Sequence, residues 1–229
     1  MTMHIGIVLF PDFTQLDAMG PFEFFSRVPG ATVHLVAHDL GTVTSDTGLS
    51  VLPTSTFAQC PALDVLCVPG GPGQTEVMED DVLLAFLRQQ GAQAQYVTSV
   101  CTGSMLLGAA GLLRGYRATS HWSCVDDVAL FGGIPTRERV VRDRNRITGG
   151  GVTAGIDFAL TVVAELIDAQ GAQLLQLALE YDPAPPFDAG APHKAPAHLT
   201  NVLRAVRAQT WGRRHEVNLR VAQTMEPPA

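Results

Sequence analysis

Cys101 is the residue whose position most favours covalent chemistry. It follows residues 96–100, in which β-branched side chains favour an extended chain, and small residues lead from it into a helical pattern over residues 105–110. A thiol at such a junction lies against the first free N–H groups of a helix, which favour the thiolate. The same strand-turn-helix geometry exposes the nucleophile in hydrolase elbows, so we expect Cys101 to be a nucleophile. The alternative is a buried structural cysteine.

Two further side chains could move protons at this site. Asp17 comes just before a helical pattern, where it serves either as the N-cap or as a pocket acid with a raised pKa. Asp12 is the competing carboxyl, but it falls in the exposed part of the loop. His121 is the one histidine placed between core elements, so it is either a base for Cys101 or a hydrogen-bonded, half-buried side chain.

Backbone groups complete the predicted site. The glycine-rich stretch 70–73 contains little that could pack, so the N–H groups of Gly71 and Thr102 are candidates to hold a developing negative charge. The alternative for Gly71 is a tight turn that needs a positive φ. The run Gly149–Gly151 would let the start of a helix approach the site closely.

These residues need a scaffold, and the hydrophobic pattern supplies one. Apolar strands alternate with helices, which is typical of an α/β fold with a mostly parallel central sheet covered by helices on both faces. A hairpin is expected around residues 143–145. The predicted strands cover residues 3–10, 32–37, 64–68 and the stretch before Cys101, and the predicted helices cover 17–28, 78–90, 152–168, 170–180 and 197–223.

The bulk composition excludes several classes of protein. The 229 residues are 46% apolar and 16% charged, which predicts one globular domain, 1–229, with a helical C-terminal extension from about residue 195. The net charge of −7 argues against a nucleic-acid binder, and no run is long enough to cross a membrane. The basic residues near the C-terminus are expected on a solvated helix face: Lys194, Arg204, Arg207, Arg213, Arg214 and Arg220.

The cysteines give no sign of a metal site or a disulfide framework. The four residues, Cys60, Cys67, Cys101 and Cys124, are dispersed and form no CxxC pair. The N-terminal residues read as a strand without an export signal, so a cytoplasmic location with reduced thiols is expected.

Several motifs along the chain resemble the PfpI-type cysteine superfamily, whose flavodoxin-like sandwich is related to class I glutamine amidotransferases. Within that superfamily the chain is similar to the isocyanide (isonitrile) hydratases. The motifs are Gln15-Leu16-Asp17, Pro69-Gly70-Gly71, Ala118-Thr119-Ser120-His121-Trp122, and the stretches 96–103, 107–115, 139–143, 148–160 and 180–187.

This resemblance implies a role for each matching position. Cys101 would be the nucleophile, Asp17 the acid/base that contacts the substrate carbon, and Thr102 a supporting residue. Gly150 and Val152 would lie on the helix packed beside Cys101. The resemblance also implies a homodimer with active sites near the interface, a small isocyanide as substrate, and no metal or organic cofactor.

Two departures from related proteins narrow the choice of activity. Thr102 follows the cysteine where many peptidase-like relatives have histidine, and the chain ends too early for the helix-turn-helix domain of transcriptional relatives. Isocyanide hydration is therefore the leading hypothesis. The alternatives are a glyoxalase- or deglycase-like thiol enzyme, in which His121 would carry the proton, and a non-catalytic redox sensor in which Cys101 is oxidised.

Overall fold

The computed structural model describes residues 2–225 and has a seven-stranded central sheet. Its strand order is β5-β2-β1-β6-β7-β11-β10, and neighbouring strands are parallel except for the β10–β11 hairpin. The sheet strands are β1 (Met3–Val8), β2 (Ala31–Ala37), β5 (Ser55–Thr56), β6 (Val65–Val68), β7 (Tyr96–Val100), β10 (Val140–Asp143) and β11 (Arg146–Gly149). The α/β class and the hairpin predicted from the sequence are therefore confirmed.

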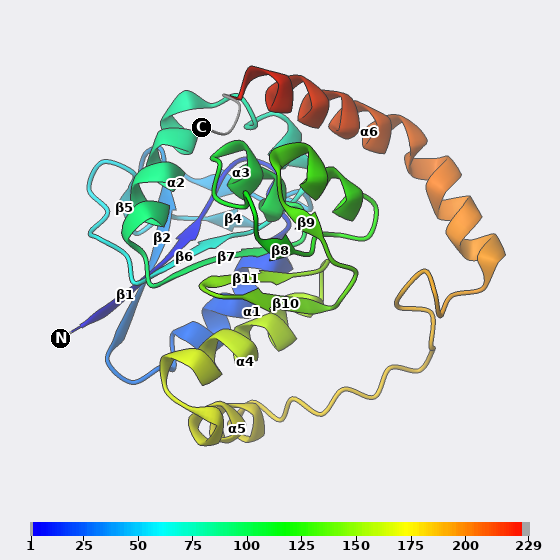
Figure 1. Ribbon diagram of the computed structural model, residues 1–229. Helices are drawn as coiled ribbons and strands as arrows, with labels where there is room; N and C mark the ends of the chain where they lie inside the picture. Colours follow the sequence, from blue (N-terminus) through cyan, green and yellow to red (C-terminus); the bar gives the residue numbers. More distant parts are fainter. Residues whose placement is uncertain (1, 226–229) are drawn as a thin grey trace.

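Helices cover both faces of this sheet (Figure 1). On one face, α1 (Gln15–Phe25) packs against α4 (Ala154–Leu166), and α5 (Ala169–Ala178) follows α4. On the other face lie α2 (Asp81–Gln93), α3 (Gly103–Ala109) and the 3-10 helix η2 (Val125–Phe131). The C-terminal half of α6 (Ala197–Thr224) packs on η2 and α3, whereas its N-terminal half extends away from the sheet (Figure 1). No helix among residues 2–225 is long and apolar enough to cross a membrane.

Local chemistry explains where the helix boundaries differ from the sequence prediction. The helix expected from residue 78 begins at Asp81, because the Asp80 side chain caps it by accepting the N–H groups of Val82 and Leu83, each at 3.0 Å. Residues Pro72–Thr75 form the separate 3-10 helix η1. The helix expected from residue 152 begins at Ala154.

Short strands of two residues are among the elements that the sequence did not predict, together with the 3-10 helices η1 and η2. The short strands are β3 (Val43–Thr44), β4 (Ser50–Val51) and the sheet-edge strand β5, together with the pair β8 (Arg117–Ala118) and β9 (Ile134–Pro135). A two-residue strand has no periodicity of its own, so only tertiary pairing defines it.

The direction in which strands are added to the sheet reverses between β1 and β6. From β1 the chain moves outward to β2 on one side, and β6 returns to pair with β1 on the other side. In open α/β sheets, ligands bind at such a switch point, beyond the carboxyl ends of the strands. The loops that follow β1, β6, β7 and β11 meet there, and they carry the residues singled out in the sequence.

Candidate active site

Cys101 lies at the turn between β7 and α3, with a left-handed φ of +57°. Its N–H donates to the carbonyl oxygens of Gly149 and Gly150 at 3.0 and 3.1 Å. The hydroxyls of Ser104 and Ser120 donate to its own carbonyl oxygen at 3.2 and 2.9 Å. The strained backbone is thus held from both sides, as at a nucleophile elbow. The side chain is only 5% exposed.

Hydrogen bonds join the loop after β1 to the loop after β6 and to the elbow. The Thr14 N–H donates to the Gly70 carbonyl oxygen at 2.8 Å. The Gly71 N–H donates to the Thr102 hydroxyl at 3.0 Å. The Thr102 side chain therefore joins the glycine-rich loop to the turn that carries Cys101, which is consistent with a supporting role.

Gly71 has the positive φ expected of a tight turn, but its N–H is not free. Its φ is +142°, and a Cβ there would lie 2.5 Å from the carbonyl oxygen of Asp12. Because its N–H is directed at the Thr102 hydroxyl, the predicted donor pair of Gly71 and Thr102 does not form in this structure. The Thr102 N–H remains the donor beside the thiol, and it favours the ionised form of Cys101 by lowering the thiol pKa.

Asp17 is fully buried in the first turn of α1 and faces Cys101. The N-cap of α1 is Thr14, so the N-cap interpretation of Asp17 is wrong. The Gly70 N–H donates to Asp17 Oδ2 at 3.1 Å, whereas Oδ1 is buried and has no hydrogen-bond partner in the described part of the chain. Burial raises the pKa of Asp17 to about 8, although the Gly70 N–H and the Cys101 thiol both oppose this shift. Asp12 is exposed, as expected.

A protonated Asp17 makes the stability of the fold depend on pH. The unfolded carboxyl ionises above its ordinary pKa of 3.8, whereas the folded one keeps its proton until about pH 8. The native state therefore binds more protons in this window, and stability falls as pH rises through it. We expect Asp17→Asn, which needs no proton to stay neutral, to be more stable than wild type at pH 8 by an amount on the order of a few kcal/mol.

Denaturant titrations of both proteins at about pH 5 and pH 8 measure this difference. The gain should shrink at the lower pH, where the wild-type carboxyl costs less to bury. A gain that is equal at both pH values, or absent at pH 8, would contradict a neutral buried Asp17.

The thiol of Cys101 does not have the lowered pKa that the helix start predicts. Burial raises the pKa of Cys101 well above its ordinary value of 9.0, and the charges of Asp17 and Cys124 raise it further. The Thr102 N–H and Arg214 oppose this shift without reversing it. The short helix α3 has only seven residues, so desolvation outweighs its dipole. At neutral pH both members of the pair hold a proton.

His121 lies beside Cys101 with a fixed tautomer. Its Nδ1 accepts the Ser123 N–H at 3.2 Å and lies 2.7 Å from the Ser123 hydroxyl, so the ring proton is on Nε2. A Cβ on Gly151 would lie 2.3 Å from His121 Cδ2 and 3.1 Å from Cys101 Sγ, which places the ring and the sulfur against the same backbone. Burial and the charge of Arg214 lower the pKa of His121 to about 4. The imidazole is therefore neutral and is a poor base.

Gly150 and Val152 lie beside the site, but not on a helix. The Gly150 carbonyl oxygen accepts the Cys101 N–H, and Val152 packs half-buried against the core. Both residues precede α4, which begins at Ala154, so their predicted place on the helix is wrong by a few residues. The Gly-rich segment, rather than the helix itself, contacts Cys101.

Arg214 does not lie on the solvated helix face that the sequence predicts for it. It is only 7% exposed, and its charge acts on Cys101, Cys124 and His121. A signal for its burial exists in the sequence, because Arg214 lies in helical phase with Val217 and Val221, which are also buried.

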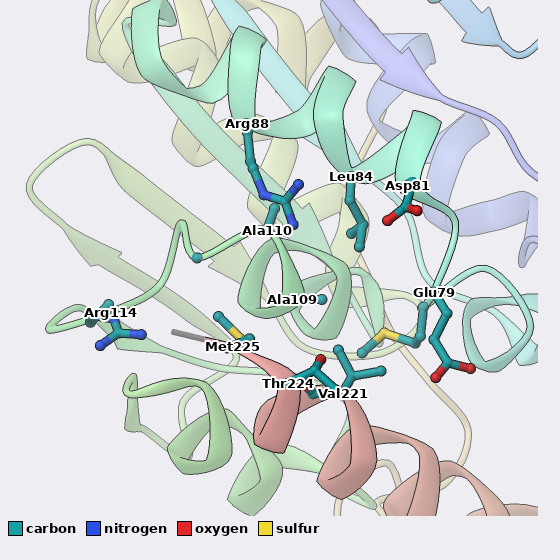
Figure 2. Close-up of a pocket in the computed structure, with 12 residues that line it drawn as sticks. Glu79, Asp81, Leu84, Arg88, Ala109, Ala110, Arg114, Val221, Thr224 and Met225 are labelled. Carbon is teal, nitrogen blue, oxygen red and sulfur yellow. The ribbon is translucent and has the colours of Figure 1, made fainter. Parts of the chain in front are cut away.

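A cavity of about 610 Å³ lies away from the thiol. It lies where α2 and α6 meet the C-terminal end of α3, whereas Cys101 precedes the N-terminal end of α3. Figure 2 shows the acidic Glu79 and Asp81 on one side of it and the basic Arg88 and Arg114 on the other. No group of three or more metal-ligating side chains occurs within residues 2–225.

Comparison with known proteins matches this arrangement to a family. The model of the DJ-1/PfpI family matches residues 3–165, which contain the sheet and the site residues from Asp17 to Val152. The chain belongs to the DJ-1/PfpI family. The family resemblance predicted from the sequence motifs is therefore confirmed.

Individual relatives in the DJ-1/PfpI family differ in how much of the chain they share. An isonitrile hydratase from Pseudomonas putida is 54% identical over 222 residues, which are 97% of either chain. A crystal structure of a THiJ/PfpI family protein from Pseudomonas syringae superposes with a TM-score of 0.93 at 50% identity, covering 95% of this chain and 91% of that one. A transcriptional regulator from Pseudomonas aeruginosa, GbdR, is 33% identical over 69% of this chain, but the match covers only 45% of the regulator.

Proposed function

We propose that this protein is an isocyanide hydratase that converts an isocyanide and water into an N-substituted formamide. The observation that carries the proposal is the pairing of Cys101 with the buried, protonated carboxyl of Asp17. Addition to the carbon of an isocyanide requires both a nucleophile and a proton donor. Cys101 supplies the nucleophile and Asp17 the proton. The close match to the isonitrile hydratase over nearly the whole chain supports the same activity.

The reaction begins with addition across the terminal carbon of the isocyanide. The Cys101 sulfur forms a bond to this carbon, while Asp17 delivers a proton to it and takes up the proton of the thiol. The product of this step is a thioimidate, in which the former isocyanide carbon bears one hydrogen and a double bond to nitrogen. The unpartnered Oδ1 of Asp17 is the atom suited to deliver the proton, because Oδ2 is engaged by the Gly70 N–H.

Water completes the reaction. It adds its oxygen to the thioimidate carbon and a proton to the nitrogen, and the carbon–sulfur bond then breaks. The thiol regains its proton and the N-substituted formamide leaves, so atoms and electrons balance without a metal or an organic cofactor. Thr102 holds the glycine loop in place during these steps through its bond to the Gly71 N–H.

The alternative activities receive less support from the geometry. A glyoxalase- or deglycase-like reaction needs His121 as the proton carrier, but this imidazole has a pKa lowered to about 4 and an occupied Nδ1. A redox sensor needs a thiol that ionises readily, whereas burial raises the pKa of Cys101. Both observations favour hydration, in which neutral Cys101 and neutral Asp17 react together.

A substrate panel tests this function. Alkyl and aryl isocyanides and methylglyoxal would be offered to the wild-type protein and to Cys101→Ala, and the products would be followed by NMR. We expect the corresponding formamide from at least one isocyanide and no turnover of methylglyoxal. Turnover of methylglyoxal without formamide production would reject the hydratase in favour of the glyoxalase-like enzyme.

We also propose that the protein acts as a homodimer, as the sequence resemblance implies, and that it works in the cytoplasm. Support for a second copy comes from the N-terminal half of α6, where apolar side chains at helical spacing are exposed: Leu199, Val202, Leu203 and Val206. The C-terminal half of the same helix buries Val217 and Val221 on the rest of the chain.

Charge placed on this exposed stripe should weaken the dimer. We expect wild-type protein to sediment as a dimer and Leu203→Glu to shift toward the monomer, because an apolar contact would then hold an unpaired carboxylate. Arg204→Glu, at the neighbouring exposed position, is the matched control for added negative charge. A monomeric wild-type protein at micromolar concentration would overturn the dimer.

A further inference from the structure

Arg214 is a buried cation whose positive charge lacks a paired carboxylate. It lies on α6 and is 7% exposed, and its Nη1 donates to the Ser123 hydroxyl at 3.3 Å. Its Nε is buried and has no hydrogen-bond partner, and no carboxylate lies within ion-pair distance of it in the part of the chain that the structure describes. A buried charge without a counter-ion is costly. Such a cation favours any negative charge that forms nearby.

The rest of α6 is anchored so that this cation stays in place. Asn218 donates to Asp127 Oδ2 at 2.8 Å, and His215 Nδ1 lies 2.8 Å from Asp127 Oδ1. Val217 is buried one turn after Arg214. Asp127 is therefore held by the residues that follow Arg214, and it is not the counter-ion of the guanidinium.

The groups that face the Cys101 sulfur come from several elements. Asp17 approaches from α1, and His121 and Cys124 come from the segment before η2. Arg214 comes from α6 and reaches this group through the Ser123 hydroxyl, which lies 3.3 Å from Arg214 Nη1 and 2.7 Å from His121 Nδ1. Its charge lowers the pKa of Cys124 and, to a smaller extent, that of Cys101, and it also lowers the pKa of His121. Asp127 of η2 has the opposite effect, because its charge raises the pKa of Cys124. Arg214 is thus the one cation among these groups at neutral pH, within the described residues.

We propose that Arg214 is a positioning residue for the covalent step, in which its guanidinium, held by Ser123, stabilises the negative charge that forms on the Cys101 sulfur. The charge forms when the thiol proton moves to Asp17 while Asp17 gives its own proton to the isocyanide carbon. The sulfur electron pair then makes the carbon–sulfur bond, and the charge disappears. The inference rests on the proposed function for the identity of the electrophile, whereas the buried position of Arg214 beside Ser123 and Cys124 does not depend on that function.

Alkylation of Cys101 tests the interaction without any isocyanide. Wild type, Arg214→Met and Arg214→Lys would be treated with iodoacetamide from about pH 6 to about pH 9, and the modification of Cys101 quantified by peptide mapping. Because only the thiolate reacts, Arg214→Met should slow alkylation at a fixed pH by about tenfold for each unit by which the thiol pKa rises. Arg214→Lys keeps the charge and should recover part of the rate.

Two control variants separate charge from packing. Arg213→Met removes the neighbouring cation, which is exposed and pairs with Glu76 on the surface, so it should alkylate at the wild-type rate. Val217→Ala weakens the packing of the same helix without changing a charge, so it should slow alkylation much less than Arg214→Met does. If Val217→Ala or Arg213→Met slows the reaction as much as Arg214→Met, or if Arg214→Met reacts like wild type, the proposal is wrong.

Steady-state kinetics then connect this interaction to catalysis. With a good isocyanide, Arg214→Met should lower kcat more than it raises KM, because the charge exists in the transition state and not in bound substrate. If wild type makes no formamide while Arg214→Met still slows alkylation, the proposed function fails and the role of Arg214 beside Cys101 remains. Equal alkylation rates with intact wild-type turnover would instead reject the role of Arg214 alone.

Discussion

Replacing Cys101 by alanine or by serine is expected to abolish formamide production while the fold stays intact. The reason is that the elbow between β7 and α3 presents the sulfur to Asp17, and neither a methyl group nor a poorly nucleophilic hydroxyl can form the thioimidate. The measurement is formamide formation followed by NMR, with circular dichroism and thermal unfolding to show that each variant is folded. Substantial turnover by Cys101→Ala would rule out covalent catalysis.

The other cysteines provide matched controls for this substitution. Cys67 is buried within β6, where burial raises its pKa to about 12, and Cys60 is half-buried in a loop, with a pKa raised to about 11. Neither lies at the elbow, so alanine at either position should leave turnover close to wild type. Cys124 is a less suitable control, because the Ser120 hydroxyl contacts both the Cys124 sulfur and the Cys101 carbonyl oxygen.

The order of strands and helices could be predicted because each long element carries its own pattern. The stretches that became β1, β2, β6 and β7 are mostly apolar and rich in β-branched residues, as is typical of buried parallel strands. Helix ends were less accurate where capping decides them, as at Asp80. The two-residue strands could not be predicted, since their hydrogen bonds depend on partners far along the chain.

The members of the active site could be predicted better than their protonation. Residue type and spacing favoured Cys101 as a nucleophile, whereas they left Asp17 open between an N-cap and an acid, and only the family resemblance favoured the acid. The loop ends of a parallel sheet explain why the two residues lie close together. The helix start suggested a lowered thiol pKa, but the desolvation that raises the pKa of both groups depends on how deeply the finished fold buries them. That depth is a property of the packed loops and not of local sequence.

Arg214 shows a different limit of sequence reasoning. In a helix with several arginines, composition favours a solvated face, and Arg213 and Arg220 do form exposed ion pairs with Glu76 and Glu79. Whether one arginine of such a helix is buried depends on which face meets η2, and that contact is tertiary. The sequence does hold one indication that Arg214 is buried, because Arg214 lies on the same helix face as the apolar Val217.

The proton donor can be identified by comparing Asp17→Asn with His121→Asn. Asparagine keeps the shape of Asp17 and removes the transferable proton, so the hydration rate should fall by about 10²–10⁴-fold, the usual contribution of general acid–base catalysis. His121→Asn should cost much less, because the imidazole is neutral and its Nδ1 already accepts hydrogen bonds from Ser123.

Steady-state kinetics of both variants with one good isocyanide would show which substitution lowers the hydration rate more. A glyoxalase-like mechanism predicts the opposite order, because its proton would pass through His121. Unfolding curves at the assay pH are needed for each variant, since His121 packs against Trp122 and Trp211 and its loss could disturb the site indirectly. If His121→Asn lowers the rate more than Asp17→Asn does, and both variants remain folded, then Asp17 is not the acid. Such a result would show that the reaction does not depend on the proton that Asp17 carries.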